Sequence, residues 1–133
     1  MTQCSSFPRK DKEGTWILPE MIDAYNELFN LGYAHSVEVY ENDELVGGLY
    51  GVALGKIFSG ESMFAKKSNA SKTAFVHLCR HLHSQGFEWV DCQQDTPHMR
   101  SMGGELVSEN DFMEILRHNH IYMLSNGEKH FLK

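Results

Sequence analysis

A chain of 133 residues has the size of one ordinary domain and is long enough to bury a hydrophobic core. Its formal net charge of −6, from 18 acidic and 12 basic side chains, argues against strong non-specific binding to nucleic-acid phosphates. It has no apolar run long enough to cross a bilayer, and its polar start lacks the apolar segment of a secretory signal. We therefore expect a single domain over residues 1–133 that acts in the cytoplasm without a membrane.

Metal and disulfide chemistry have little support in the sequence. The three cysteines, Cys4, Cys79 and Cys92, are odd in number and lack the CxxC spacing of zinc sites. His77 and His81 have the i, i+4 spacing of two ligands on one helix face, but no cysteine or acid stands at a suitable distance as a third ligand. We expect no metal site and no cofactor, and the unpaired cysteines fit a reducing cytoplasm.

The first elements in chain order are a polar segment, a helix and a strand. Residues 1–14 are predicted to be irregular and flexible. Pro19 suits a first helical turn, apolar residues recur on one helix face after it, and Gly32 ends the helix. Residues 36–41 alternate as SVEVYE, which predicts a strand, and Asn42-Asp43 then turns the chain into a hairpin.

The segment from Leu45 to Phe64, LVGGLYGVALGKIFSGESMF, is apolar or small almost throughout. Its glycines are poor strand formers and indicate bulges or close approach by a ligand or backbone. We predict a hairpin that turns at Gly55-Lys56 and ends in Glu61. Glu61 is the only carboxylate between Glu44 and Glu88. The pattern leaves open whether it faces solvent from the strand or lies in a pocket.

The second half of the chain is predicted to alternate helices with short strands. A helix capped at Ser68 or Asn69 runs to about Gln85 and carries an apolar stripe, and Gly86 closes it. A strand follows over residues 89–93. Four shorter elements complete the prediction: a helical segment from Pro97 to Gly103-Gly104, a strand at residues 105–107, a helix capped at Ser108 or Asn110, and a strand at residues 129–132.

Three polar side chains are candidates for chemistry. Period-two alternation places Asp91 and Gln93 on one face of their strand, and Glu61 ends a neighbouring hairpin. Their convergence in an apolar neighbourhood would suit acyl transfer, because an attacking amine must lose a proton and the developing oxyanion needs a hydrogen-bond donor. The chain has no GxSxG motif and no credible Ser/His/Asp or Cys/His nucleophile, which favours direct transfer without a covalent enzyme intermediate.

Four blocks carry a family resemblance: EGTWILPEMIDAY, LGYAHSVEVYENDELVGGLYGVALGKIFSGESMF, NASKTAFVHLC and DCQQDTPHMRSMGG. In order and with short gaps, over about residues 13–104, they resemble the leucyl/phenylalanyl-tRNA-protein transferases of bacteria. The resemblance implies an aminoacyltransferase that moves Leu or Phe from aminoacyl-tRNA to proteins with an N-terminal Lys or Arg. It also implies an α/β (α+β) fold similar to the GCN5-related acetyltransferases, with a mixed, largely antiparallel sheet flanked by helices.

The same resemblance implies roles for individual residues. Asp91 would orient Gln93, and Gln93 would assist proton removal from the attacking α-amino group. Glu61 would contact the aminoacyl end, and Trp16 would stack near the terminal adenosine of the tRNA. The pocket for the Leu or Phe side chain would be lined by apolar residues: Leu49, Phe58, Met63, Phe75 and Leu82.

The chain departs from the family pattern at both ends of the matching region. It begins where an N-terminal domain of the family ends, so we expect a separate partner or a second copy of the chain to replace that domain. After Gly104, the sequence SENDFMEILRHN lacks the basic pair that the family tends to show before its final helix.

Two other functional classes stay open. A non-catalytic binding module of the same fold would recognise protein N-termini or an apolar amino acid. An acyl-CoA N-acyltransferase would require a Q/RxxGxG/A loop whose backbone N–H groups hold a pyrophosphate. The corresponding stretch, AKKSNASK, has no glycine, which disfavours this third class.

Overall fold

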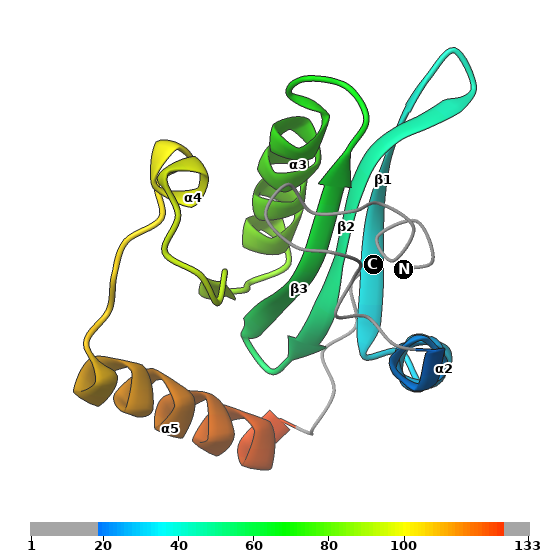
Figure 1. Ribbon diagram of the computed structural model, residues 1–133. Coiled ribbons are helices and arrows are strands. Elements are labelled where there is room, and N and C mark those ends of the chain that lie inside the picture. Colours follow the sequence, from blue (N-terminus) through cyan, green and yellow to red (C-terminus); the bar gives the residue numbers. More distant parts are fainter. Residues whose placement is uncertain (1–18, 127–133) are drawn as a thin grey trace.

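The computed structural model describes residues 19–126, which form a four-stranded sheet with helices on both faces (Figure 1). The elements in chain order are α2 (Pro19–Asn30), β1 (Ala34–Glu41), β2 (Glu44–Leu54), β3 (Ile57–Ala65), α3 (Ala70–Ser84), β4 (Trp89–Asp91), α4 (Pro97–Ser101) and α5 (Glu109–Asn126). The strand order is β1-β2-β3-β4; the first three strands pair antiparallel and β4 pairs parallel to β3. The predicted α/β class with a mixed, mostly antiparallel sheet is confirmed.

Two tight turns build the antiparallel part of the sheet. Asn42 and Asp43 have φ values of 51° and 65°, the backbone pattern of a two-residue type I′ hairpin turn. Asn and Asp tolerate this left-handed region better than other residues with side chains. Gly55, at φ 59°, turns the chain between β2 and β3, where a Cβ would collide with the side chain of Asn119. Both turns lie where the sequence predicts them.

The main core lies between α3 and one face of the sheet. The α3 stripe recurs at every fourth residue, so that its members share one side of the helix. Each large side chain buried in this layer contributes about 1.5–3 kcal/mol relative to an exposed one. The buried residues of this core are Leu49, Ala53, Phe58, Ala74, Leu78, Leu82 and Phe87.

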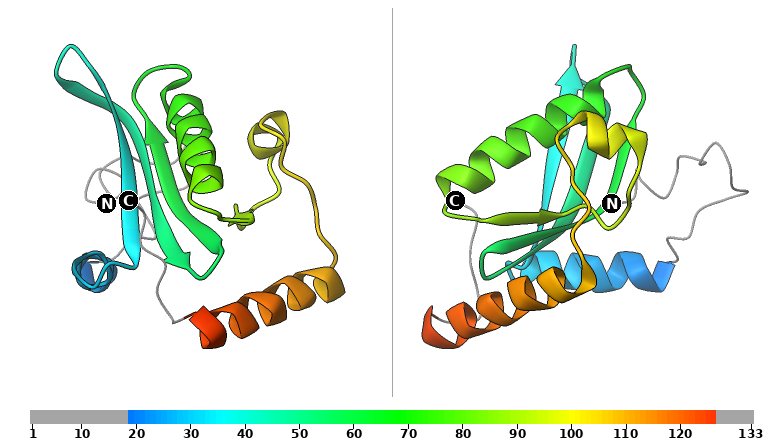
Figure 2. Two further views of the ribbon diagram at one scale, coloured as in Figure 1. Left: turned by 180° about the vertical axis from the view of Figure 1, so that it is seen from behind. Right: turned by 90° about the vertical axis from the view of Figure 1, so that its left-hand side faces the viewer.

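A smaller cluster lies on the opposite face, beneath α2. Ile22 and Tyr25 of α2 pack against Tyr50, together with Phe64. The rings of Tyr25 and Tyr50 meet edge to face, with centroids 5.5 Å apart. Because Leu49 and Tyr50 are neighbours on β2, they point to opposite faces of the sheet. Figure 2 shows the result, with α3 on one side of the sheet and α2 on the other.

Helix α5 is attached to the turn between β2 and β3. The Asn119 side chain accepts a hydrogen bond from the Lys56 N–H at 2.7 Å and donates one to the Leu54 carbonyl at 3.1 Å. At the start of the helix, Ser108 Oγ accepts from the Asp111 N–H at 3.1 Å, so Ser108 is the cap that the sequence predicts. No helix within residues 19–126 is long and apolar enough to cross a membrane.

Some local predictions are wrong. Residues 105–107 form no strand, because no other strand in the described part of the chain pairs with their backbone. Asn69 does precede α3, but at φ 69° its side chain makes no capping hydrogen bond. The strand predicted over residues 89–93 stops at Asp91. The predicted flexible segment 1–14 and strand 129–132 lie outside the described residues, and the single domain over 1–133 stays a prediction.

Candidate functional site

A β-bulge in β3 sets the position of Glu61. Across β2 and β3, Tyr50 pairs with Ser62 while Gly51 pairs with Gly60, so Glu61 is an extra residue without a partner on β2. A bulge bends its strand locally and changes the direction of the extra side chain. Glu61 is half-buried and lines a cavity, which decides between the two alternatives that the sequence left open.

The Glu61 carboxylate joins α2 to the loop after β4. Tyr25 Oη donates to Glu61 Oε2 at 2.8 Å, and Gln93 Nε2 donates to Glu61 Oε1 at 3.3 Å. The first bond crosses 36 residues of sequence and the second crosses 32. A single carboxylate therefore fixes two segments that the chain order keeps far apart.

Gln93 reaches the site from a left-handed turn rather than from a strand. Its φ is 61°, and its backbone N–H donates to Asp91 Oδ1 at 2.9 Å. Its side-chain nitrogen also lies 3.0 Å from Ser59 Oγ. The predicted approach of Asp91, Gln93 and Glu61 is present, but the assumed strand alternation is wrong because β4 ends two residues before Gln93.

These contacts determine which way the Gln93 amide faces. An ionised carboxylate can only accept hydrogen bonds, so the amide nitrogen of Gln93 must face Glu61. The amide oxygen is then left as an acceptor on the other side of the group. Residues that hold a side chain in one orientation in this way are a common feature of preorganised sites.

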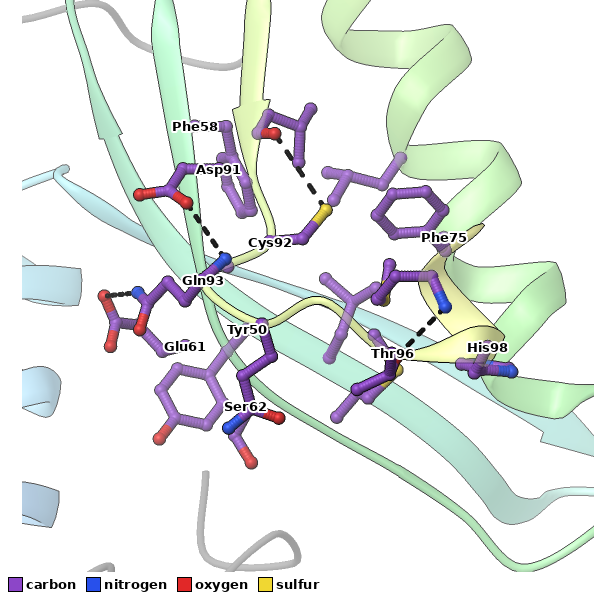
Figure 3. A pocket seen from close by; sticks show the side chains of 17 residues that line it. Tyr50, Phe58, Glu61, Ser62, Phe75, Asp91, Cys92, Gln93, Thr96 and His98 are labelled. Atoms are coloured by element: carbon purple, nitrogen blue, oxygen red, sulfur yellow. Dashed lines mark hydrogen bonds between the residues drawn. The ribbon is translucent and has the colours of Figure 1, made fainter. Parts of the chain in front are cut away.

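A cavity of about 590 Å³ opens beside this polar group (Figure 3). This volume lies within the usual range for small-molecule sites. Phe58 of β3 and Phe75 of α3 line this cavity. Glu61 and Gln93 lie on its polar side. Four of the five apolar residues predicted for the substrate pocket line it: Leu49, Phe58, Met63 and Phe75.

One predicted site residue lies elsewhere, and another lies outside the described residues. Leu82 does not line the cavity; it is 1% exposed and belongs to the core between α3 and the sheet. Leu78, one turn earlier on the same helix stripe, does line it. Trp16 lies outside the described residues, so its predicted stacking on adenosine stays a prediction.

Several lining residues were not singled out from the sequence. Tyr25, which does not line the cavity but holds Glu61, was not singled out either; it sits on the apolar face of α2, and a hydroxyl on such a face is the one available signal. The loop after β4 and helix α4 also contribute residues to the cavity lining. The lining residues that sequence reasoning missed are Tyr50, Gly60, Ser62, Leu78, Val90, Cys92, Gln94, Thr96, His98 and Met99.

Two protonation states at the site follow from burial. Burial, the hydrogen bond to Glu61 and the charge of that carboxylate together raise the pKa of Tyr25 to about 12. The Tyr25 hydroxyl therefore stays a donor at neutral pH. Burial and then the charge of Asp91 raise the pKa of the Cys92 thiol, which keeps it protonated and a weak nucleophile. Within residues 19–126, no group of three or more His, Cys, Asp or Glu side chains could hold a metal ion.

Comparison with known proteins decides the family. The sequence model of the leucyl/phenylalanyl-tRNA protein transferases matches residues 1–117 of the chain. The chain belongs to this transferase family. The match includes the bulge of β3, the loop after β4 and the helix that carries Tyr25.

Similar members of the transferase family come from several bacteria. The leucyl/phenylalanyl-tRNA–protein transferase of Nitrosospira multiformis is 52% identical over 129 residues, which are 97% of this chain and 55% of that protein. That of Hydrogenovibrio crunogenus is 52% identical over 117 residues, 88% of this chain and 46% of the relative. That of Chromobacterium violaceum is 50% identical over 119 residues, which are 90% of this chain and 51% of the relative. The chain thus spans about half the length of these transferases.

Proposed function

We propose that this chain transfers Leu or Phe from aminoacyl-tRNA to the N-terminal Lys or Arg of an acceptor protein, in the cytoplasm. The observation that carries the proposal is the fixed Gln93 amide on the wall of an apolar cavity. Membership of a family named for this reaction supports the same chemistry.

The apolar part of the cavity is proposed to hold the Leu or Phe side chain. Leu49, Phe58, Met63 and Phe75 provide aliphatic and aromatic walls but no charge. Burying a side chain of this size is worth about 1.5–3 kcal/mol, which would favour Leu and Phe over small or polar amino acids. The proposed site is therefore selective by shape and polarity.

The polar part of the cavity is proposed to handle the proton of the attacking amine. The acceptor's α-amino nitrogen attacks the ester carbonyl carbon, so that a C–N bond forms while the ester C–O bond breaks. The amide oxygen of Gln93 accepts a hydrogen bond from the attacking nitrogen, and the proton that the nitrogen loses ends on the departing ribose oxygen. Asp91 fixes the backbone of Gln93, and Glu61 fixes its amide, in agreement with their contacts.

Direct attack is favoured over a covalent enzyme intermediate. Cys92 is the lining residue with the best nucleophilic atom, but its raised pKa leaves little thiolate at neutral pH. The amine of the acceptor is itself a sufficient nucleophile once it is neutral. A trapped acyl-enzyme at Cys92 would contradict this part of the proposal.

Binding of whole tRNA is proposed to need a further polypeptide, either a partner protein or a second copy of this chain. The net charge of −6 supports this requirement, because phosphate contacts depend on Lys and Arg.

The first test is transfer from Phe-charged tRNA to a peptide that begins with Arg. We expect a product one Phe longer by mass spectrometry, and no product from the same peptide with an acetylated N-terminus, because acetylation removes the nucleophile. Gln93→Ala and Asp91→Asn should each lower kcat at least a hundredfold while the midpoint of thermal unfolding changes little, since Gln93 is exposed and Asp91 is not in the core.

The outcomes of this assay separate the candidate functions. No transfer by the wild type, alone or with the N-terminal half of a relative added, would exclude the catalytic proposal. Binding of the Arg peptide without transfer would select the non-catalytic binding module instead. A large loss of stability in Gln93→Ala or Asp91→Asn would assign this loop a structural role.

A further inference from the structure

Helix α5 carries an apolar stripe that faces away from the sheet. In Figure 1 the helix lies beyond the end of the sheet where β2 turns into β3, whereas α2 and α3 cover the two faces. None of its side chains from Glu109 to Ser125 is buried, although a helix of this length normally gains its stability by packing an apolar face on another element. One side of α5 meets the β2–β3 turn: Asn119 bonds to its backbone, and the ring of Tyr122 lies 4.8 Å from Lys56 Nζ. The helical repeat turns four large apolar side chains, between 38% and 71% exposed, to the other side: Met113, Leu116, Ile121 and Leu124.

The spacing of this stripe reads the same in both directions along the helix. Its members are three, five and three residues apart. When two α5 helices lie antiparallel, Met113 therefore faces Leu124 of the second copy, and Leu116 faces Ile121. A two-fold axis between the helices makes each of these contacts twice, so the stripe is complementary to itself. Stripes of this width allow two helices to pack with their axes about 8–10 Å apart.

The charges of α5 also favour an antiparallel pair. Its three acids, Glu109, Asp111 and Glu114, all lie in the first third of the helix, and residues 115–125 contain none. A parallel pair would place these acids beside the same acids of the second copy, which is unfavourable in an interface. An antiparallel pair places them along the acid-free part of the other helix, and it also brings the opposite ends of the two helix dipoles together.

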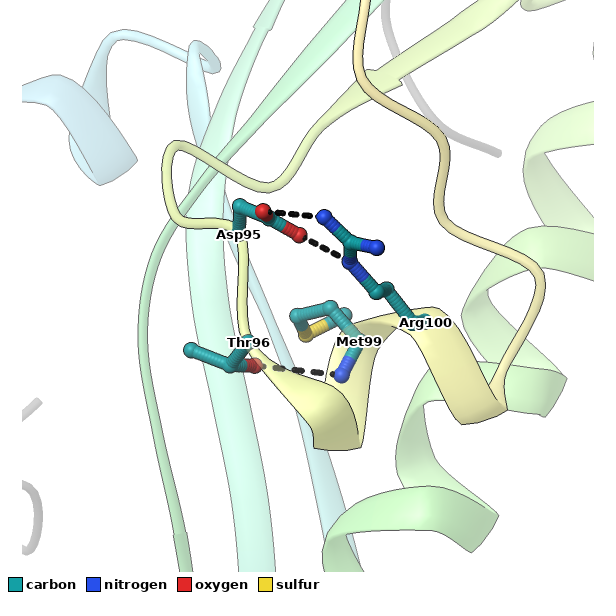
Figure 4. Close-up of polar contacts among 4 residues, drawn as sticks. All are labelled: Asp95, Thr96, Met99 and Arg100. Atoms are coloured by element: carbon teal, nitrogen blue, oxygen red, sulfur yellow. Dashed lines mark hydrogen bonds and ion pairs between the residues drawn. The ribbon is translucent and has the colours of Figure 1, made fainter.

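The bases near the stripe do not suit a nucleic acid as its occupant. Arg117 is paired with Glu114 of the same helix, through an Nη2–Oε2 contact of 2.5 Å. Arg100 of α4, which lines a smaller cavity together with Phe112 of α5, is held by both carboxylate oxygens of Asp95 at 2.5 Å (Figure 4). Acids that pair with these guanidinium groups reduce the positive potential that a phosphate backbone would require. The exposed stripe instead suits a protein surface of the same apolar character.

We propose that this stripe is a self-association surface, through which two copies of the chain pair by antiparallel contact of their α5 helices. One helix per copy buries less than the roughly 800 Å² per partner of a standard interface. The dimer should therefore be weak, with a dissociation constant of about 1–100 µM. The inference does not depend on the transfer reaction, and it selects the second copy from the two polypeptides that the proposed function names for binding tRNA.

Sedimentation equilibrium of the full chain tests the surface. The mass should rise from that of one chain towards that of two over about 1–300 µM protein. Leu124→Glu puts a carboxylate into the stripe and should raise the dissociation constant about tenfold or more. Phe29→Glu is the matched control, because Phe29 is also an exposed apolar residue near the end of a helix, α2, and it should leave the dissociation constant within twofold.

A third variant tests the antiparallel direction. In the proposed dimer, residue 124 faces Met113 of the second copy, with Glu109 and Glu114 of that copy beside it. Leu124→Lys should therefore weaken the dimer at least about threefold less than Leu124→Glu does, because the lysine meets acids. In a parallel dimer, residue 124 would face its own copy, so the two variants would repel equally. Equal dissociation constants for Leu124→Lys and Leu124→Glu would overturn the antiparallel pairing.

The remaining outcomes decide whether the stripe binds a second copy at all. A wild type that keeps the mass of one chain at 300 µM, about the upper limit of the expected range, would overturn the inference. Equal weakening by Leu124→Glu and Phe29→Glu would also overturn it. If the N-terminal half of a relative binds the single chain and Leu124→Glu abolishes that binding, the stripe belongs to that polypeptide and not to a second copy. These experiments measure mass and not transfer, so failure of the proposed function leaves them unaffected.

Discussion

At the residue scale, the site depends on hydrogen bonds between side chains that lie far apart in the sequence. Glu61 accepts from Tyr25 on one oxygen and from Gln93 on the other. A hydrogen bond to an ionised group is worth about 1.5–3 kcal/mol, more than a bond between neutral groups. The orientation of the Gln93 amide therefore depends on a tyrosine from a helix that contributes no lining residue of the cavity.

Removing the hydroxyl of Tyr25 should impair the proposed transfer reaction more than it impairs folding. Tyr25→Phe keeps the ring that packs on Tyr50 and deletes the donor to Glu61. We expect kcat to fall about three- to tenfold while the KM for the aminoacyl substrate stays within twofold, because Glu61 can then rotate and release the side-chain amide of Gln93. Tyr40→Phe is a matched control, since Tyr40 Oη also donates to a glutamate, Glu38, at 2.8 Å, but on the exposed surface. Equal loss of kcat in both variants would refute the positioning role of Tyr25.

The same bond has a defined pH dependence in unfolding experiments. The pKa of Tyr25 is raised from its usual 10.0 to about 12 in the folded protein, so the folded state retains a proton that the unfolded chain releases. Its contribution to stability is complete below pH 10 and is lost as the pH rises towards 12. The difference in unfolding free energy between wild type and Tyr25→Phe, about 1.5–3 kcal/mol, should be constant from pH 6 to 9 and shrink above pH 10. Urea titrations across this range measure it.

At the scale of the elements, the bulge in β3 needs glycine on the facing strand. A Cβ on Gly51 would lie 2.6 Å from the buried Phe58 ring and against the backbone oxygen of Ser59. Neither neighbour can move without shifting β3 and, with it, Glu61. The glycine-rich character of this hairpin is therefore a packing requirement next to the site.

Gly51→Ala should accordingly lower the unfolding free energy by about 2 kcal/mol or more, as overpacked cores do. Gly60→Ala provides the comparison, because a Cβ there would meet only the Asp91 carbonyl oxygen, at an ordinary 3.5 Å. We expect that change to cost less than about 1 kcal/mol. Urea unfolding of the two variants measures the contrast, and similar values for both would show that β2 and β3 can separate freely at the bulge.

At the scale of the whole molecule, the charge balance limits how the chain can meet a nucleic acid. Several of the described basic residues are paired with acids: Lys56 with Glu88, Lys67 with Glu41, and Arg100 with Asp95. Surface pairs of this kind contribute little to stability, but they reduce the positive potential available for phosphates.

Binding of tRNA by this chain alone should therefore depend weakly on salt. The logarithm of the association constant, plotted against the logarithm of NaCl concentration, should have a slope between 0 and about −3, the value for few phosphate contacts. Filter binding or fluorescence anisotropy between 50 and 200 mM NaCl, about the range where such slopes are defined, measures it. A slope near −6 or steeper would reveal a basic surface that the charge balance does not predict.

The sequence by itself determined the class of fold, most helices and both hairpin turns. These features depend on local periodicity and on residues such as Asn42-Asp43 and Gly55, whose backbone preferences act without distant contacts. Family membership was also readable from the motif blocks, because they span most of the matched region.

Tertiary structure alone decided how the site is assembled. The extra residue of the bulge depends on the register between β2 and β3, and no local pattern specifies that register. The turn at Gln93, the bond from Tyr25 and the exclusion of Leu82 from the cavity all depend on contacts between distant segments. The predicted strand at residues 105–107 is wrong for the same reason, because residues with high β propensity form a strand only when another strand pairs with them. The sequence thus identified most of the candidate site residues, and three-dimensional packing determined which of them are in contact.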